Sequence, residues 1–236
     1  MILSIIPARK GSKGILRKNL ALLGGKPLVQ HTISAALESN LVDEILLSTD
    51  DEEVTLLGCK LGLKNEYIRP QEISADSTGM IDTVLHAVSW FEEVRGYLPD
   101  QILLLQPTSP LRTQVDIDSA ITLFKSENAN SLVSVHPMRE HPYECILKED
   151  QRKWSFLAES HSKVFRRQDY QQNYQFINGA IYLVDTKKLI EKRALVFPGE
   201  SLLYEMPFSR GVDIDTAFDL KTAELILSNQ ELLDDI

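Results

Sequence analysis

The sequence predicts an α/β protein whose mostly parallel sheet is covered by helices on both faces. Short apolar runs rich in β-formers alternate with stretches whose apolar residues recur at helical spacing. Strands that alternate with helices in this way form parallel sheets with two buried faces. No internal repeat and no Pro/Gly-rich linker divides the 236 residues, of which 43% are hydrophobic. We therefore expect a single domain over residues 1–236, large enough to bury a substantial core.

The expected strands lie in the apolar runs. They span Ile2 to Ile6, Glu44 to Ser48, Gln101 to Leu105, Ser131 to Val135 and Ile177 to Val184. Two helices are expected between the early strands, with apolar residues at Val29, Ile33, Ala36 and Leu37 and at Ile81, Val84, Leu85 and Val88. In such sheets ligands bind at the carboxyl ends of the strands, so the residues directly after each strand are the candidates for the functional site.

Residues 137–176 break the alternation of strands and helices. This stretch is rich in aromatic and basic residues, among them Tyr143, Trp154, Phe156, Arg166 and Tyr170. One interpretation is an irregular insertion packed on its own domain. The other is an arm that docks on a second subunit, because aromatic residues and arginine are enriched at interface cores.

The overall charge is acidic, with 34 Asp plus Glu against 25 Lys plus Arg and a formal net charge of -9. Such a chain has no global field that would attract nucleic acid or an anionic membrane, so we expect neither as a partner. The start of the chain lacks the features of a signal peptide, and no apolar run approaches the roughly 20 residues that span a bilayer. The two cysteines and five histidines show no zinc or disulfide spacing. We expect a cytoplasmic protein.

A cluster of cations stands out against this acidic background. Residues 9–18 contain five Lys or Arg in ten positions and follow the first strand directly. Gly11 and Gly14 would let backbone N–H groups approach a ligand there, and the cations would neutralise a polyanion such as a nucleoside triphosphate. The spacing is neither that of a P-loop nor that of a dinucleotide-binding loop. The alternative is a solvated basic loop at the surface.

Asp213 and Asp215 form a second candidate site. Being two residues apart, their carboxylates project from one face of an extended segment, and paired carboxylates suit Mg²⁺. Alternatively they cap the helix that follows. Asp116 and Asp118 repeat the pattern ahead of an expected helix that reaches Phe124, and we interpret them as an N-terminal helix cap.

Two further polar residues lie near strand ends or turns. Gln106 follows the apolar run ending at Leu105 and could orient a ligand from a rigid position; alternatively it belongs to a helix-entry turn. Arg69, beside Pro70, is on its own most simply a surface cap.

Five motifs in order resemble those of the acylneuraminate cytidylyltransferases, the CMP-sialic acid synthetases. They are Ile5-Ile6-Pro7-Ala8-Arg9-Lys10-Gly11-Ser12-Lys13-Gly14-Ile15 with Lys18-Asn19, Gly25-Lys26-Pro27-Leu28, Gln106-Pro107-Thr108-Ser109-Pro110-Leu111-Arg112, Asn178-Gly179-Ala180-Ile181-Tyr182 and Asp213-Ile214-Asp215-Thr216. The resemblance implies a Rossmann-like nucleotidyltransferase fold, with residues 137–176 as a dimerisation arm in a homodimer. It also implies Mg²⁺-dependent transfer of CMP from CTP to the anomeric hydroxyl of a nine-carbon 2-keto sugar acid (N-acetylneuraminate, legionaminate or pseudaminate), with release of pyrophosphate.

The resemblance also assigns roles to individual residues. Catalysis falls to Lys18, Arg9 and Asp215, and the metal to Asp213 and Asp215. The residues expected to bind the nucleotide are Arg9, Ser12, Lys13, Lys18, Asn19 and Arg69. Those expected to bind the sugar are Gln106, Arg112 and Asn178, with Arg166, Arg167 and Gln168 on the arm reaching a partner's site. Met80 stands where the family has a polar residue, which leaves the contacts to the nucleotide base open in this stretch.

Four alternatives remain for the function. Two are sugar nucleotidyltransferases, one acting on 3-deoxy-manno-octulosonate and the other a guanylyltransferase for an amino-sugar phosphate. A metal-dependent glycosyltransferase would use the Asp-x-Asp pattern but leaves the cation loop unexplained. A nucleotide-binding domain without catalytic activity would be expected to have lost Lys18, Asp213 or Asp215, and all three are present.

Overall fold

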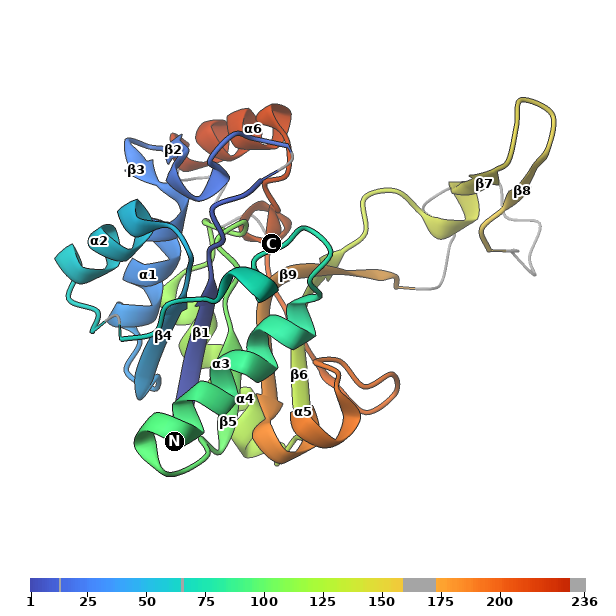
Figure 1. Cartoon of the computed structure of the whole chain (residues 1–236). Helices are drawn as coiled ribbons and strands as arrows, with labels where there is room; N and C mark the ends of the chain where they lie inside the picture. The colour runs from blue at the N-terminus through green and yellow to red at the C-terminus, as the bar shows by residue number, and fades with distance from the viewer. Residues whose placement is uncertain (13, 65, 159–172, 230–236) are drawn as a thin grey trace.

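A six-stranded sheet runs through the centre of the structure (Figure 1). The computed structural model describes residues 1–12, 14–64, 66–158 and 173–229. The sheet consists of β10 (Leu202–Glu205), β6 (Ser131–Pro137), β9 (Gln175–Asp185), β5 (Gln101–Leu104), β1 (Ile2–Pro7) and β4 (Glu44–Ser48), in this spatial order. β9 is antiparallel to β5 and β6, whereas β1 is parallel to β4 and β5 and β10 is parallel to β6. The predicted mostly parallel sheet is confirmed.

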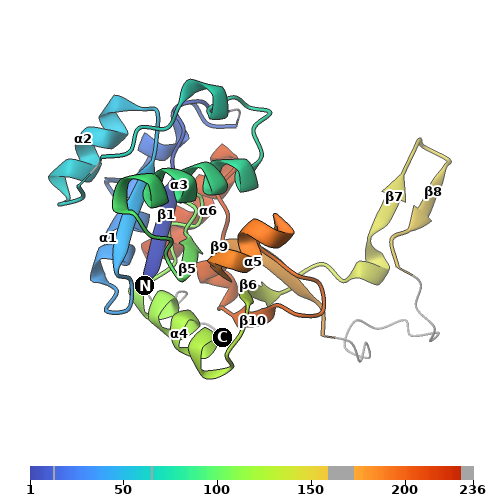
Figure 2. The ribbon, with the colours of Figure 1, turned by 60° about the horizontal axis from the view of Figure 1, so that its bottom comes forward.

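Helices cover both faces of the sheet, as predicted (Figure 2). They are α1 (Leu28–Glu38), α2 (Glu52–Lys60), α3 (Met80–Arg95), α4 (Gln114–Ser126), α5 (Thr186–Lys192) and α6 (Ala217–Leu227). Ile33 of α1 and Ile121 of α4 share a core cluster with Ile6. Val88 of α3 belongs to another cluster with Ile5. The neighbours Ile5 and Ile6 enter different clusters because successive strand residues point to opposite faces. Within the described part of the chain, no helix is long and apolar enough to cross a membrane.

The carboxyl ends of β1, β4, β5 and β6 meet at the upper edge of the sheet in Figure 1. α6 and the short strands β2 (Leu22–Leu23) and β3 (Lys26–Pro27) lie at the same edge. Leu23, Ile214 and Ile226 belong to a small hydrophobic core cluster at this edge. Because Ile214 is buried in this core, the segment that leads from β10 to α6 is fixed at the sheet edge.

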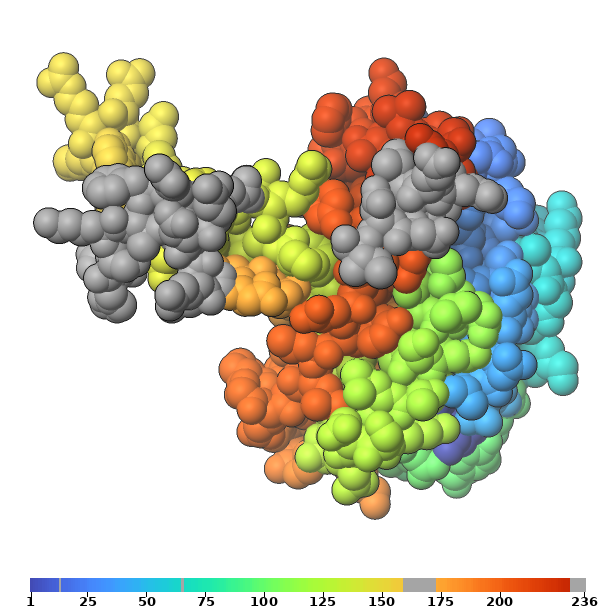
Figure 3. All heavy atoms as spheres, turned by 180° about the vertical axis from the view of Figure 1, so that it is seen from behind, coloured from blue at the N-terminus to red at the C-terminus, as the bar shows by residue number. Residues whose placement is uncertain are grey.

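An extended segment leaves the body between β6 and β9 and carries an antiparallel hairpin, β7 (Ile146–Lys148) and β8 (Trp154–Phe156). Figure 3 shows this hairpin, in yellow, standing off from the body. All six of its strand residues are exposed. Tyr143 and Tyr174 pack their rings against His141, tilted and edge-to-face respectively, where the segment leaves the body. The hairpin falls within the predicted stretch 137–176.

The helix caps differ from the prediction. α4 begins at Gln114, and Thr113 is its N-cap, with Asp116 completing a capping box by accepting from the Thr113 N–H at 2.9 Å. Asp118 lies in the next turn and accepts from Ser39, so the interpretation of this pair as an N-terminal cap holds only for Asp116. The cap of α6 is likewise a threonine, Thr216. A threonine hydroxyl reaches the N–H three residues on, which is the bond that the helix start requires.

Candidate active site

A cavity of about 420 Å³ opens at the carboxyl ends of the strands. It is bounded by the loop after β1, the loop after β5, the start of α3 and the segment before α6. The predicted site residues that line it are Arg9, Ser12, Lys18, Asn19, Arg69, Gln106, Asp213 and Asp215. Residues from four separated parts of the chain thus meet in one place.

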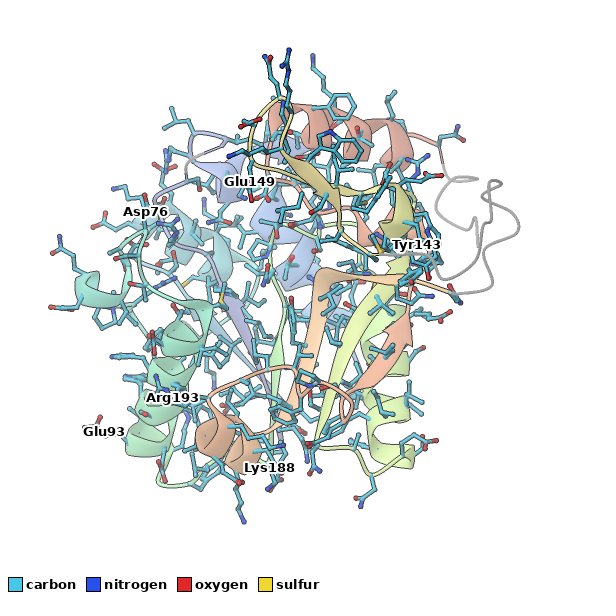
Figure 4. The ribbon with its side chains drawn as sticks, turned by 90° about the vertical axis from the view of Figure 1, so that its right-hand side faces the viewer. Asp76, Glu93, Tyr143, Glu149, Lys188 and Arg193 are labelled. Carbon is cyan, nitrogen blue, oxygen red and sulfur yellow. The ribbon has the colours of Figure 1, made fainter. Side chains whose placement is uncertain are left out.

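The cation loop forms one wall of this cavity. The guanidinium of Arg9 forms an ion pair with Asp76, which Figure 4 places toward the upper edge of the sheet. Asn19 donates from its amide to the carbonyl of Arg9 at 2.8 Å and so ties the two ends of the loop together. The ammonium of Lys18 lies 2.8 Å from Oδ1 of Asp215. The loop is therefore held over the cavity rather than extended into solvent.

Gly14 is needed at its position because of a close approach. A Cβ on this residue would lie 2.0 Å from the carbonyl oxygen of Asp215, which no backbone tolerates without moving. The glycine that the sequence suggested for approach to a ligand instead lets the cation loop touch the carboxylate segment. Both walls of the cavity are thus fixed relative to each other at Gly14 and Asp215.

We expect Gly14→Ala to slow the reaction proposed below by about ten- to a hundredfold, because ångström-scale misplacement of catalytic groups costs that much. The melting temperature should change little, since the loop lies outside the main core. The matched variant Gly11→Ala adds a Cβ that, among the described residues, meets just the Arg9 side chain, at 3.5 Å, and should lose less activity. Equal activity of the two variants in pyrophosphate release would contradict the spacing argument.

The carboxylates of Asp213 and Asp215 flank the buried Ile214, whose N–H donates to the carbonyl of Thr108 at 2.8 Å. With Ile214 turned inward, both acids reach the cavity. Desolvation by the surrounding protein raises the pKa of Asp213, and Asp215 adds to the effect, whereas Thr108 and Lys18 oppose it. A pair of carboxylates that repel each other beside an anion-binding loop is a donor set that suits a hard divalent cation.

The described residues hold no cluster of three or more His, Cys, Asp or Glu side chains that could bind a metal by themselves. This agrees with the coordination of Mg²⁺, which proteins usually hold by one or two carboxylates together with water and substrate phosphates. The residues present therefore fit Mg²⁺ better than a closed structural site for zinc.

Arg69 is buried, with 5% of its surface exposed, so it is not a surface cap. Its guanidinium donates to the carbonyl of Ile73 and, at 2.8 Å, to the hydroxyl of Thr83. Burial lowers its pKa, and Asp50 and Tyr67 oppose the shift. Arg69 thus joins the loop ahead of α3 to the first turns of that helix, beside the cavity.

Arg112 and Asn178 lie behind the cavity wall rather than in it. Arg112 is 2% exposed and donates to the carbonyl of Ala180 at 2.7 Å and to the hydroxyl of Thr32 at 2.8 Å. Burial lowers its pKa to about 10. Asn178 is 1% exposed, and its Oδ1 accepts from Ser134 at 2.6 Å. Arg112 thus joins the loop after β5 to α1 and to the middle of β9, and Asn178 joins β9 to β6.

Sequence reasoning did not assign roles to several residues that line the cavity, namely Thr78, Thr83, Pro107 and Thr108. Pro107 and Thr108 lie inside the motif that begins at Gln106, so their position after β5 was a usable signal. Met80, noted as a departure from the family, also lines the cavity. Lys13, Arg166, Arg167 and Gln168 lie outside the described residues.

The fold and the cavity together define an α/β protein with a polar ligand cavity at the carboxyl ends of its strands. The chain belongs to the cytidylyltransferase family: the model of that family, described as "Cytidylyltransferase", matches residues 3–198. It is a nucleotidyltransferase, as the motifs predicted.

Three relatives share 32% of their aligned residues with the chain. A CMP-N,N'-diacetyllegionaminic acid synthase of Legionella pneumophila aligns over 98% of this chain and 99% of its own length. A pseudaminic acid cytidylyltransferase of Campylobacter jejuni aligns over 95% of both chains. An N-acylneuraminate cytidylyltransferase of Streptococcus agalactiae aligns over 91% of this chain, which spans half the length of that relative. The predicted resemblance to the acylneuraminate cytidylyltransferases is confirmed.

Solved structures agree in fold. CMP:2-keto-3-deoxy-manno-octonic acid synthetase in complex with CTP has a TM-score of 0.68 at 18% identity and covers 97% of this chain and 99% of its own. A 4-diphosphocytidyl-2C-methyl-D-erythritol synthase from Anaerococcus prevotii has a TM-score of 0.66 at 13% identity and covers 97% and 98%. The predicted nucleotidyltransferase fold is confirmed.

Proposed function

We propose that the protein transfers CMP from CTP to the anomeric hydroxyl of a nine-carbon 2-keto sugar acid and releases pyrophosphate. The observation that carries the proposal is the convergence of Arg9, Lys18, Asp213 and Asp215 on one cavity. That set combines cations for a triphosphate with carboxylates for a divalent ion. The names of three relatives, all cytidylyltransferases or CMP-sugar-acid synthases, support the same reaction.

The chemistry requires in-line attack on the α-phosphate while negative charge moves to the leaving pyrophosphate. Such a reaction is accelerated chiefly by positioning and by fixed positive charge. Arg9 and Lys18 supply that charge from the cation loop, and Ser12 offers a neutral hydrogen bond. Lys18 is already neutralised by Asp215 at 2.8 Å, so the triphosphate takes over an ammonium that the fold has placed in advance.

Asp213 and Asp215 would hold Mg²⁺. When bound, the ion neutralises charge on the phosphoryl oxygens as a Lewis acid. Gln106 presents its amide to the cavity from the end of β5, in reach of a sugar hydroxyl or carboxylate, and its Oε1 lies 3.6 Å from where a Cβ on Gly179 would be. That is an ordinary van der Waals distance, but Gly179 has φ 75°, a left-handed conformation that disfavours a side chain at this position.

Pyrophosphate release tests the proposal. Purified protein with CTP and Mg²⁺ is assayed against N-acetylneuraminate, legionaminate and pseudaminate, with 3-deoxy-manno-octulosonate and an amino-sugar phosphate with GTP as the competing substrates. We expect turnover with CTP and at least one nine-carbon acid, and none without the acceptor. Turnover with only a competing substrate, or with none of the panel, would contradict the proposal.

We further propose that the protein is a cytoplasmic homodimer and that the hairpin β7–β8 docks on the second copy. An isolated two-stranded hairpin is marginally stable in water. Here Leu147, Trp154 and Phe156 are each more than half exposed, and clustered exposed apolar side chains mark interaction surfaces. Cys59 and Cys145 are free thiols, which suits a reducing compartment.

Sedimentation at micromolar concentration is expected to give a dimer. Replacing Leu147 and Trp154 together with serine removes apolar area from the hairpin and should shift the protein toward monomer, with little effect on the melting temperature of the body. The matched surface variant Leu56→Ser, on α2 and 59% exposed, should remain dimeric. A wild-type protein that sediments as a fully active monomer would refute the shared arm.

A further inference from the structure

Arg17 combines an unusual backbone conformation with a position outside the cavity lining. Its φ and ψ are 52° and 44°, in the left-handed region. A side chain with a Cβ rarely adopts this conformation, and such strain persists only where the surrounding structure enforces it. Glycine would suit the backbone here, so the reason for arginine must lie in its side chain.

The side chain of Arg17 is tied to the start of α2. Its Nη2 lies 2.9 Å from Oε1 of Glu53 and 3.4 Å from Oδ2 of Asp51. Asp51 is a firm anchor, because its side chain is 5% exposed and it caps α2 by accepting from the Glu53 N–H at 2.9 Å. The cation loop is thus joined to the body through a buried carboxylate.

The residue after Arg17 reaches in another direction. The carbonyl of Arg17 accepts from the N–H of Leu20 at 2.8 Å, which closes the 3-10 turn η1 (Lys18–Leu20). From that turn Lys18 extends to Asp215. Two adjacent cations therefore contact two separate parts of the molecule: Arg17 contacts the start of α2, and Lys18 contacts Asp215. The left-handed backbone of Arg17 lies where these two directions separate.

We infer that Arg17 is a positioning residue whose ion pairs with Glu53 and Asp51 fix the turn that delivers Lys18 to the cavity. The inference rests on the proposed function, in which Lys18 contacts the triphosphate. The side chain of Arg17 does not reach the substrate in this arrangement, because it is directed to α2. Its effect on the reaction passes through Lys18.

The experiment is a double-mutant cycle on pyrophosphate release. Arg17→Gly keeps the backbone conformation accessible and removes the ion pairs, and we expect kcat to fall by about tenfold through misplacement of Lys18. In a Lys18→Ala background the same change should cause no further loss, because effects that act through one group are not additive. Arg17→Lys, which can still pair with Glu53, should recover part of kcat.

The outcomes separate the inference from the proposed function. Slow Lys18→Ala with normal Arg17→Gly would overturn the inference alone. Normal Lys18→Ala would overturn both the role of Lys18 and the inference. A further loss in the double variant would show that Arg17 acts on the substrate itself and would also overturn it.

The chain supplies a matched control in Arg193. It too has a left-handed backbone, with φ 46°, and pairs through Nη2 with Asp82 at 2.6 Å. It is the C-cap of α5, its side chain is 63% exposed, and it does not line the cavity; Figure 4 shows it below Asp76. Arg193→Gly should leave kcat unchanged. A loss equal to that of Arg17→Gly would show that any such arginine matters and would overturn the positioning role.

Discussion

Asp215→Ala is expected to reduce pyrophosphate release by roughly a thousandfold, the scale of losing a group that stabilises transition-state charge. The variant removes one of two carboxylates at the cavity and the 2.8 Å partner of Lys18. The fold should survive, because the Asp215 side chain is 71% exposed and leaves no buried void. Its backbone stays anchored through the neighbouring Ile214. The assay is pyrophosphate release at saturating CTP and Mg²⁺, with the melting temperature recorded alongside.

The sequence contains its own control for this substitution. Asp118 occupies the corresponding place in a second Asp-x-Asp pattern, but it lies on α4 and accepts from Ser39 and Asn40. Those hydrogen bonds lower its pKa despite its partial desolvation. Asp118→Ala should therefore lower the melting temperature and leave most of the activity. Retention of activity in Asp215→Ala would remove the metal-binding assignment.

The central strands of the sheet could be predicted from the sequence because they are buried on both faces. Runs such as Ile2 to Ile6 are apolar at every position, and burial of β1 is complete along its length. β10 was not predicted, because it is a short edge strand with alternating exposure and Leu203 is 53% exposed. A half-exposed segment of this length carries too little apolar signal to be told from a loop.

The candidate site was predictable where residue type and spacing determine geometry. Asp213 and Asp215 both reach the cavity because Ile214 between them is buried, which follows from alternation in an extended segment. The contact between Gly14 and Asp215 was not predictable, since it joins segments about two hundred positions apart. Neither was the inward path of Arg112, whose partners Thr32 and Ala180 come from different elements. Such contacts depend on how distant segments pack together, and local sequence patterns do not predict this packing.

Lys18→Ala is the second substitution with a large expected effect, a loss of at least about tenfold in pyrophosphate release, on the scale of one charge-assisted contact. The Lys18 side chain is 16% exposed and lines the cavity beside Asp215. Its charge is therefore poorly screened by solvent and lies where the triphosphate must bind. If Lys18→Ala releases pyrophosphate as fast as the wild type, the loop is a basic surface segment and not a binding element.

Lys10→Ala removes the same charge from the same loop and is the control that interprets this result. The Lys10 side chain is exposed and outside the cavity lining, while its backbone N–H stays bonded to Asp50 at 2.7 Å. If Lys18 acts by direct contact, its loss should persist at 0.5 M salt and Lys10→Ala should stay near wild type. If the loop acts only as a diffuse positive field, both variants should lose activity to a similar extent. Added salt should then erase the difference from wild type, because the screening length falls below about 8 Å.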